Sequence, residues 1–135
     1  MISPTTRQIL GSITGVVTAM AVIMIVESLG HKLSGGPPMP DVQDADALAA
    51  YAASLPLGSL VSVLIAWVGG TAAGVVAGSL IAPGRQGFIA VLVGILVMLG
   101  TIAQVTQFPH PTWLIASSVV GIPAAAWIAM RAMQR

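Results

Sequence analysis

Four long stretches of the chain are almost free of charged residues and are separated by short polar or proline-rich segments. No residue from Gln8 to Val26 is charged, and the segment from Ala47 to Gly84 is also free of charge. A helix crosses the hydrocarbon core of a bilayer with about 20 apolar residues. The pattern therefore predicts four membrane-spanning helices at residues 8–29, 57–82, 87–107 and 112–130.

The loop between the first two spans, residues 32–56, has a pattern of its own. It begins with a cluster of glycines and prolines that breaks regular structure. The following residues, 41–55, predict a short helix with Asp41 as its N-cap and Asp44 in its first turn, where the helix dipole favours negative charge. The predicted fold class is thus an all-α integral membrane protein, a four-transmembrane-helix bundle with a short outer-side helix, forming one membrane domain over residues 1–135.

The composition supports this class and excludes others. Hydrophobic residues make up 56% of the chain and charged residues 7%, whereas soluble domains carry about 25% charged residues. The lipid bilayer is therefore the expected partner. The net charge of +1 argues against nucleic acid as a partner, because phosphate binding needs clustered Lys and Arg. The chain has no cysteine, which excludes thiolate metal sites and a cysteine nucleophile.

The few basic residues predict the orientation. With four alternating crossings, Arg7, Arg85, Arg131 and Arg135 fall on one side, and Lys32 falls alone on the other. Short cytoplasmic loops carry an excess of Lys and Arg. Both termini are therefore predicted to be cytoplasmic, in a multi-pass protein of the plasma membrane.

Small residues repeat every four positions on three of the predicted helices. Gly70, Gly74 and Gly78 form one ridge, Gly11 and Gly15 form a shorter one, and the fourth span has another at Ser117, Gly121 and Ala125. Such ridges allow close helix packing in lipid. One interpretation is that they only pack the four-helix bundle; the alternative is that one of them also forms a homo-oligomer contact.

The first span also carries its polar residues on a helical face. On a helical wheel Met20, Met24, Glu27 and His31 share one face, nearly opposite the two glycines of this span. One of these faces is expected to look into the bundle, and the other to pack against a neighbour.

A candidate site follows from the topology. Glu27 and His31 lie one helical turn apart at the end of the first span, and His110 lies in the loop that the topology places on the same side. Further polar residues are expected at that side of the membrane: Gln104 and Gln107 at the end of the third span, and Asp41 and Asp44 in the outer loop.

This set is open to several interpretations. Glu27, with His31, Gln104 and Gln107 around it, is predicted to bind a proton or a cation, because ionisable groups at membrane depth tend to be functional. Glu27, His31, His110, Asp41 and Asp44 are alternatively the ligands of a divalent metal such as zinc. A haem between the two histidines is a third hypothesis, and a plain Glu27–His31 ion pair at a helix end is the simplest explanation.

The spacing of several motifs resembles a family of small bacterial four-span membrane proteins without assigned activity. The motifs are Glu27-Ser28-Leu29-Gly30-His31, Pro37-Pro38-Met39-Pro40, Leu55-Pro56-Leu57 and Pro109-His110-Pro111-Thr112-Trp113. The resemblance covers nearly the whole chain. It implies a bacterial inner-membrane protein and no particular reaction.

The function predicted from the sequence is a non-enzymatic transport, channel or scaffold module that uses Glu27 as a proton or cation site. The chain contains no Walker loop, no G-x-S-x-G and no H-E-x-x-H motif. The alternative is a divalent-metal-binding membrane protein or a metal-dependent membrane enzyme.

Overall fold

The computed structural model describes residues 1–135 and contains five α-helices and no strands. This arrangement confirms the predicted fold class, a four-helix membrane bundle with one additional short helix. The helices are α1 (Pro4–Ser34), α2 (Ala45–Ser54), α3 (Leu57–Ile81), α4 (Gln86–Gln107) and α5 (Thr112–Met133).

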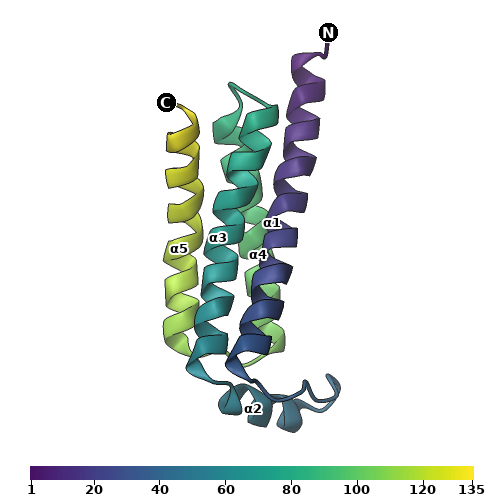
Figure 1. Ribbon diagram of the computed structural model, residues 1–135, viewed down its shortest axis with the longest axis vertical. Helices are drawn as coiled ribbons and strands as arrows, with labels where there is room; N and C mark the ends of the chain where they lie inside the picture. Colours follow the sequence, from purple (N-terminus) through teal and green to yellow (C-terminus); the bar gives the residue numbers. More distant parts are fainter.

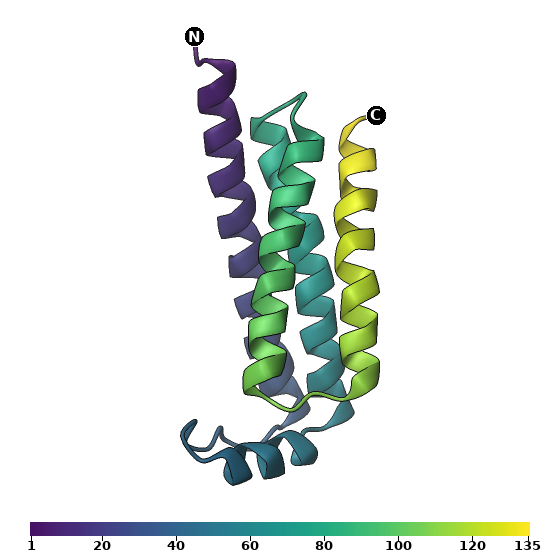
Figure 2. The same ribbon diagram turned by 180° about the vertical axis from the view of Figure 1, so that it is seen from behind.

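The four long helices run side by side in alternating directions, and α2 lies across one end of the bundle (Figure 1). Both termini and the α3–α4 loop lie at the opposite end, as the view from behind also shows (Figure 2). The loop that carries His110 joins α4 to α5 at the same end as α2. The end of α1 with His31 and the loop with His110 are therefore brought to one end of the molecule.

Helix α3 is the centre of the bundle. It packs against α1, α4 and α5, whereas α1 and α5 are not neighbours. The core is built largely from α3 and the helix faces turned toward it, with Trp67, Val75, Ile89, Leu114 and Ile122 fully buried. A polar group placed on α3 is thus surrounded by the rest of the bundle.

The outer faces of the bundle are apolar. All four long helices are long and hydrophobic enough to cross a membrane. Only 25 of the 135 residues are buried, and large side chains such as Ile13, Val17 and Met24 are exposed along α1. A surface of this kind is stable in lipid and not in water, so the chain is a small multi-pass integral membrane protein.

Glycines bring α1 and α3 into backbone contact. A Cβ atom built on Gly74 would lie 2.5 Å from the carbonyl oxygen of Gly15, and one on Gly78 would lie 2.6 Å from that of Gly11. A Cβ on Gly70 would lie 2.9 Å from the carbonyl oxygen of Ala19. The predicted ridges of α1 and α3 therefore pack against each other within one chain, where any side chain larger than hydrogen would force the helices apart.

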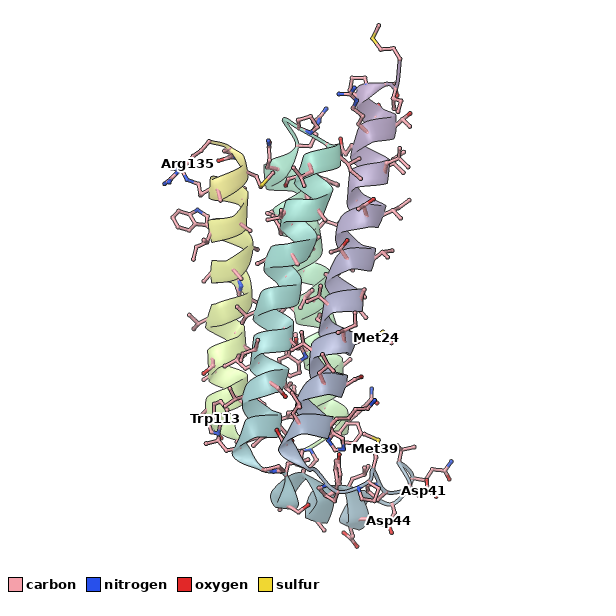
Figure 3. The ribbon with its side chains drawn as sticks, in the orientation of Figure 1. Met24, Met39, Asp41, Asp44, Trp113 and Arg135 are labelled. Atoms are coloured by element: carbon pink, nitrogen blue, oxygen red, sulfur yellow. The ribbon has the colours of Figure 1, made fainter.

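This interface also corrects the helical wheel. The buried residues of α1 are spaced four apart: Gly11, Gly15, Ala19 and Ile23. Glu27, four residues further on, also contacts α3, through its hydrogen bond to Trp67. Met24 projects outward from the bundle (Figure 3). Each step of four residues advances about 40° beyond a full turn. The contact line therefore winds around α1, and residues on nearly opposite sides of a straight wheel meet the same neighbouring helix.

The glycine ridge on α3 is fully buried in this intramolecular contact, since Gly70, Gly74 and Gly78 are all buried. A homo-oligomer stays a prediction, and it would have to use a different surface from this ridge.

The short helix α2 begins later than the sequence pattern predicts. Asp44, and not Asp41, is its N-cap: the Asp44 carboxylate accepts hydrogen bonds from the backbone N–H groups of Asp46 and Ala47, at 3.1 and 3.0 Å. The Asp41 carboxylate accepts one from Gln43 N–H in the preceding turn. Either aspartate can cap a helix. Because residues 41–44 form a turn, the helix begins only after Asp44, and Asp44 is therefore the cap.

Candidate functional site

The end of the bundle that α2 crosses contains a pocket of about 340 Å³. Residues of α1, α2, α3 and α4 line it, together with residues of the α1–α2, α2–α3 and α4–α5 loops. The polar lining residues are Glu27, Ser28, His31, Tyr51, Ser59, Gln104 and His110. The predicted gathering of Glu27 with both histidines is thus found around one cavity.

Glu27 is held by a tryptophan from the central helix. Its side-chain oxygen Oε1 accepts a hydrogen bond of 2.8 Å from the indole Nε1–H of Trp67. Trp67 is 2% exposed, so its indole has little access to any other partner. The bond fixes one carboxylate oxygen of Glu27 and leaves the other available to the pocket.

Trp67 was not among the candidates that sequence reasoning produced. It is the one tryptophan placed inside a predicted span rather than near a span end, whereas Trp113 and Trp127 are exposed on α5 (Figure 3 labels Trp113). A buried indole needs an acceptor for its N–H. Glu27 is the only carboxylate within the long helices, so this requirement is the signal that could have paired the two residues.

His110 lies beside the same indole. The ring centroids of Trp67 and His110 are 5.9 Å apart, with the planes tilted by 45°. The Nδ1 atom of His110 is 2.7 Å from the carbonyl oxygen of Phe108. Because a carbonyl only accepts, Nδ1 carries the proton of this bond, and Nε2 of the neutral ring is left as an acceptor.

His31 is covered by the turn that follows α1. A Cβ atom on Gly36 would lie 2.6 Å from Cε1 of the His31 ring, so a side chain at this position would push the imidazole aside. The Glu27 carboxylate bonds to Trp67 on the next helix. The structure contains no ion pair between Glu27 and His31, because tertiary packing turns the carboxylate toward α3.

The two glutamines at the end of α4 have different positions. Gln104 is half-buried and lines the pocket together with Glu27. Gln107 is exposed and does not line the pocket. Residues three apart are offset by about 60° around the helix axis, and here this offset leaves the Gln107 side chain outside the pocket.

The two aspartates of the outer loop stay outside the pocket. Asp41 and Asp44 are exposed and project outward from the loop before α2 (Figure 3), and their carboxylates bond to nearby backbone N–H groups. No three of the chain's His, Asp and Glu side chains lie close enough together to hold a metal ion. The five residues predicted as ligands of a divalent metal therefore do not form one group: Glu27, His31 and His110 line the pocket, and the two aspartates lie outside it.

A haem between His31 and His110 stays a prediction. Both rings line the pocket, and the visible absorption spectrum of the purified protein tests the idea directly.

Ser59 is a further pocket residue that the sequence did not single out. Its side chain is 5% exposed, and its Oγ has no hydrogen-bond partner. Among the other buried hydroxyls, those of Thr71 and Ser118 bond back to a carbonyl one turn earlier. Those of Ser79 and Thr101 also have no partner, but only Ser59 of these three lines the pocket. A buried hydroxyl without a partner at a pocket wall is available to whatever the pocket contains.

Comparisons of the chain with protein families, with curated proteins and with solved structures find no match. The resemblance to a family of small four-span proteins stays a prediction.

Proposed function

We propose that this protein is a small non-enzymatic transport module of the membrane, in which Glu27 binds a proton or a cation at one membrane surface. The observation that carries the proposal is the position of the Glu27 carboxylate. It lies between helices of a membrane bundle, bonded to buried Trp67 and facing a pocket at one end. Carboxylates are expensive in such a place and are found there mainly where they bind ions or protons.

The charge of the pocket favours a positive occupant. Glu27 is the only acidic residue in the lining, and no Lys or Arg lines the cavity. His31 and Gln104 contribute polar groups beside the carboxylate. A cation entering the pocket would therefore meet one full negative charge that no fixed positive charge neutralises.

The packing beyond the pocket favours a carrier over an open channel. Toward the other end of the bundle, the backbones of α1 and α3 are in contact at Gly15 and Gly74, and Val93 of α4 closes over them. An ion at Glu27 has no space to continue along this interface unless the helices move. Transport would then require rearrangement of the helices, as alternating access does.

The distribution of basic residues supports an orientation. Arg7, Arg85, Arg131 and Arg135 belong to the end with both termini, and Lys32 is the only basic residue at the pocket end. The positive-inside rule then places both termini in the cytoplasm and the pocket at the outer surface. Residence in a bacterial inner membrane is part of the proposal and comes from the family resemblance.

Ion flux into proteoliposomes tests the role of Glu27. Protein reconstituted into liposomes would be measured for proton flux with an entrapped pH-sensitive dye and for uptake of radioactive sodium. We expect Glu27→Gln to lower the active flux at least tenfold, because the amide cannot carry the negative charge yet still offers an oxygen to Trp67.

Gln107→Ala is the matched control, because Gln107 lies on the same membrane side outside the pocket. It is expected to leave flux at the level of the unmodified protein. Equal flux in the Glu27→Gln and unmodified proteins would remove Glu27 from the mechanism and refute the proposal.

A further inference from the structure

The size of the pocket gives a first indication of its occupant. A volume of about 340 Å³ is roughly ten times the share of one water molecule in the liquid. A proton or a bare metal ion fills little of such a space, whereas small organic molecules occupy pockets of about 300–1,000 Å³. The cavity is therefore larger than binding of an inorganic ion requires.

The walls of the pocket are amphipathic. Half of the 14 lining residues are hydrophobic, among them Leu55 directly after α2, Leu60 and Val63 of α3, and Phe108 of the α4–α5 loop. Apolar walls contribute nothing to an inorganic ion, which prefers several oxygen or nitrogen ligands. They do stabilise an occupant with hydrocarbon groups by removing its surface from water.

The polar groups of the pocket include several hydrogen-bond acceptors. Glu27 offers the oxygen that Trp67 does not use, and the Oγ of Ser59 is buried without a partner. His110 offers Nε2, because its Nδ1–H is already bonded to Phe108. A group with a positive charge and several N–H donors complements this set, and a carboxylate or phosphate does not.

From these features we propose that the pocket binds an organic ammonium ion, with its N–H donors directed to Glu27 and Ser59 and its hydrocarbon part against the apolar wall. This inference rests on the proposed function and names the class of cation for the same site. The ammonium group can belong to a free alkylamine or to the headgroup of an ethanolamine lipid, which share the same chemistry.

Calorimetric titration of the full-length protein tests the proposal. Delipidated protein in detergent would be titrated with n-butylammonium chloride, n-butanol, sodium butyrate and sodium chloride. The n-butylammonium ion differs from n-butanol and from butyrate in the charge of its polar group. It differs from the sodium ion in having a hydrocarbon chain. We expect a Kd for n-butylammonium at least tenfold below that of each other compound, and similar affinities for all four compounds would overturn the proposal.

Two variants locate the binding. Glu27→Gln is expected to raise the Kd for n-butylammonium at least tenfold, and Ser59→Ala by about threefold, whereas Gln107→Ala is expected to leave it unchanged. The comparison of compounds on the unmodified protein keeps the test decisive if one variant does not fold. An unchanged Kd in Glu27→Gln protein with an intact melting transition would overturn the assignment.

The source of the ammonium group can be separated in nanodiscs. If phosphatidylethanolamine added to a phosphatidylcholine bilayer weakens n-butylammonium binding at least threefold, the lipid headgroup competes for the pocket and is the natural occupant. Unchanged binding supports a free amine instead.

The flux measurement distinguishes the two proposals. Glu27-dependent proton or sodium flux without n-butylammonium binding overturns the ammonium assignment and leaves the transport function standing. Glu27-dependent n-butylammonium binding without any flux supports the ammonium assignment and removes transport.

Discussion

The interface between α1 and α3 changes character along its length. At the end near the termini, Gly11 and Gly15 meet Gly78 and Gly74 so closely that backbone touches backbone. At the other end, Glu27 and Trp67 take these places, and a hydrogen bond between large side chains replaces the backbone contact. The same pair of helices is thus closed at one end and holds a polar pocket at the other.

The difference shows how one helix pair can combine rigidity with a binding site. Glycines in lipid allow dense packing without any polar group, since van der Waals contact holds helices together there. At the pocket end, α1 and α3 approach each other through side chains instead: a Cβ atom on Gly30 would meet the Ser62 side chain, and one on Gly58 would lie 2.8 Å from Ser34 Oγ. The pocket lies beside this contact and is lined also by α2, α4 and the α4–α5 loop. The closed half provides a fixed frame on which the carboxylate is positioned.

The closed half is the more sensitive to substitution. Gly74→Ala would place a methyl group 2.5 Å from the Gly15 carbonyl oxygen and 2.8 Å from the Ala19 Cβ. Neither atom can rotate away, so we expect a loss of about 3 kcal/mol in unfolding free energy, at the upper end of the range for overpacking. Unfolding in detergent mixtures, followed by circular dichroism, measures it.

Gly69→Ala is the matched control for this substitution, because a Cβ atom there has no neighbour within 4 Å. Its unfolding free energy should rise by about 0.5–1 kcal/mol, because Ala favours the helix over Gly and the added methyl group meets no neighbour. Equal losses in the two variants would mean that the backbone contact does not set the stability of this half.

The open half depends on the Glu27–Trp67 hydrogen bond. Trp67→Phe removes the indole N–H donor and leaves the half-buried Glu27 carboxylate oxygen without a hydrogen bond. This loss should lower the unfolding free energy by about 2 kcal/mol. The same substitution in a Glu27→Ala background should cost less, because no carboxylate is left unpaired. This double-mutant cycle gives the coupling between the two side chains, and a coupling of zero would show that the bond does not stabilise the pocket.

Substitutions in α2, which lies across the pocket end, should have the smallest effect on stability. Asp44→Ala removes the N-cap of α2 and should destabilise that helix by about 1 kcal/mol. Amide hydrogen exchange over Ala45–Ser54 is then expected to rise about fivefold. Asp41→Ala is the control, since Asp41 bonds to the turn and not to the helix, and a similar rise in that variant would contradict the assignment of the cap.

Much of the fold was predictable because it depends on local composition. The long helices contain the apolar runs that the sequence marks, and α1 extends beyond its predicted span at both ends as a continuous helix. Four alternating crossings were enough to bring His31 and His110 to one end. Asp44 was predicted within the first turn of α2 and proves to be its cap, because only the turn geometry separates two neighbouring aspartates.

The sequence by itself determined which segments cross the membrane and which polar residues share an end, because the length of an apolar run and the parity of crossings need no knowledge of contacts. Only the tertiary structure decided that Glu27 bonds to Trp67, that Gln104 enters the pocket while Gln107 does not, and that the outer-loop aspartates stay away. These choices depend on how α1 winds around α3. That path is set by backbone contacts between glycines far apart in the chain, and no local pattern encodes it.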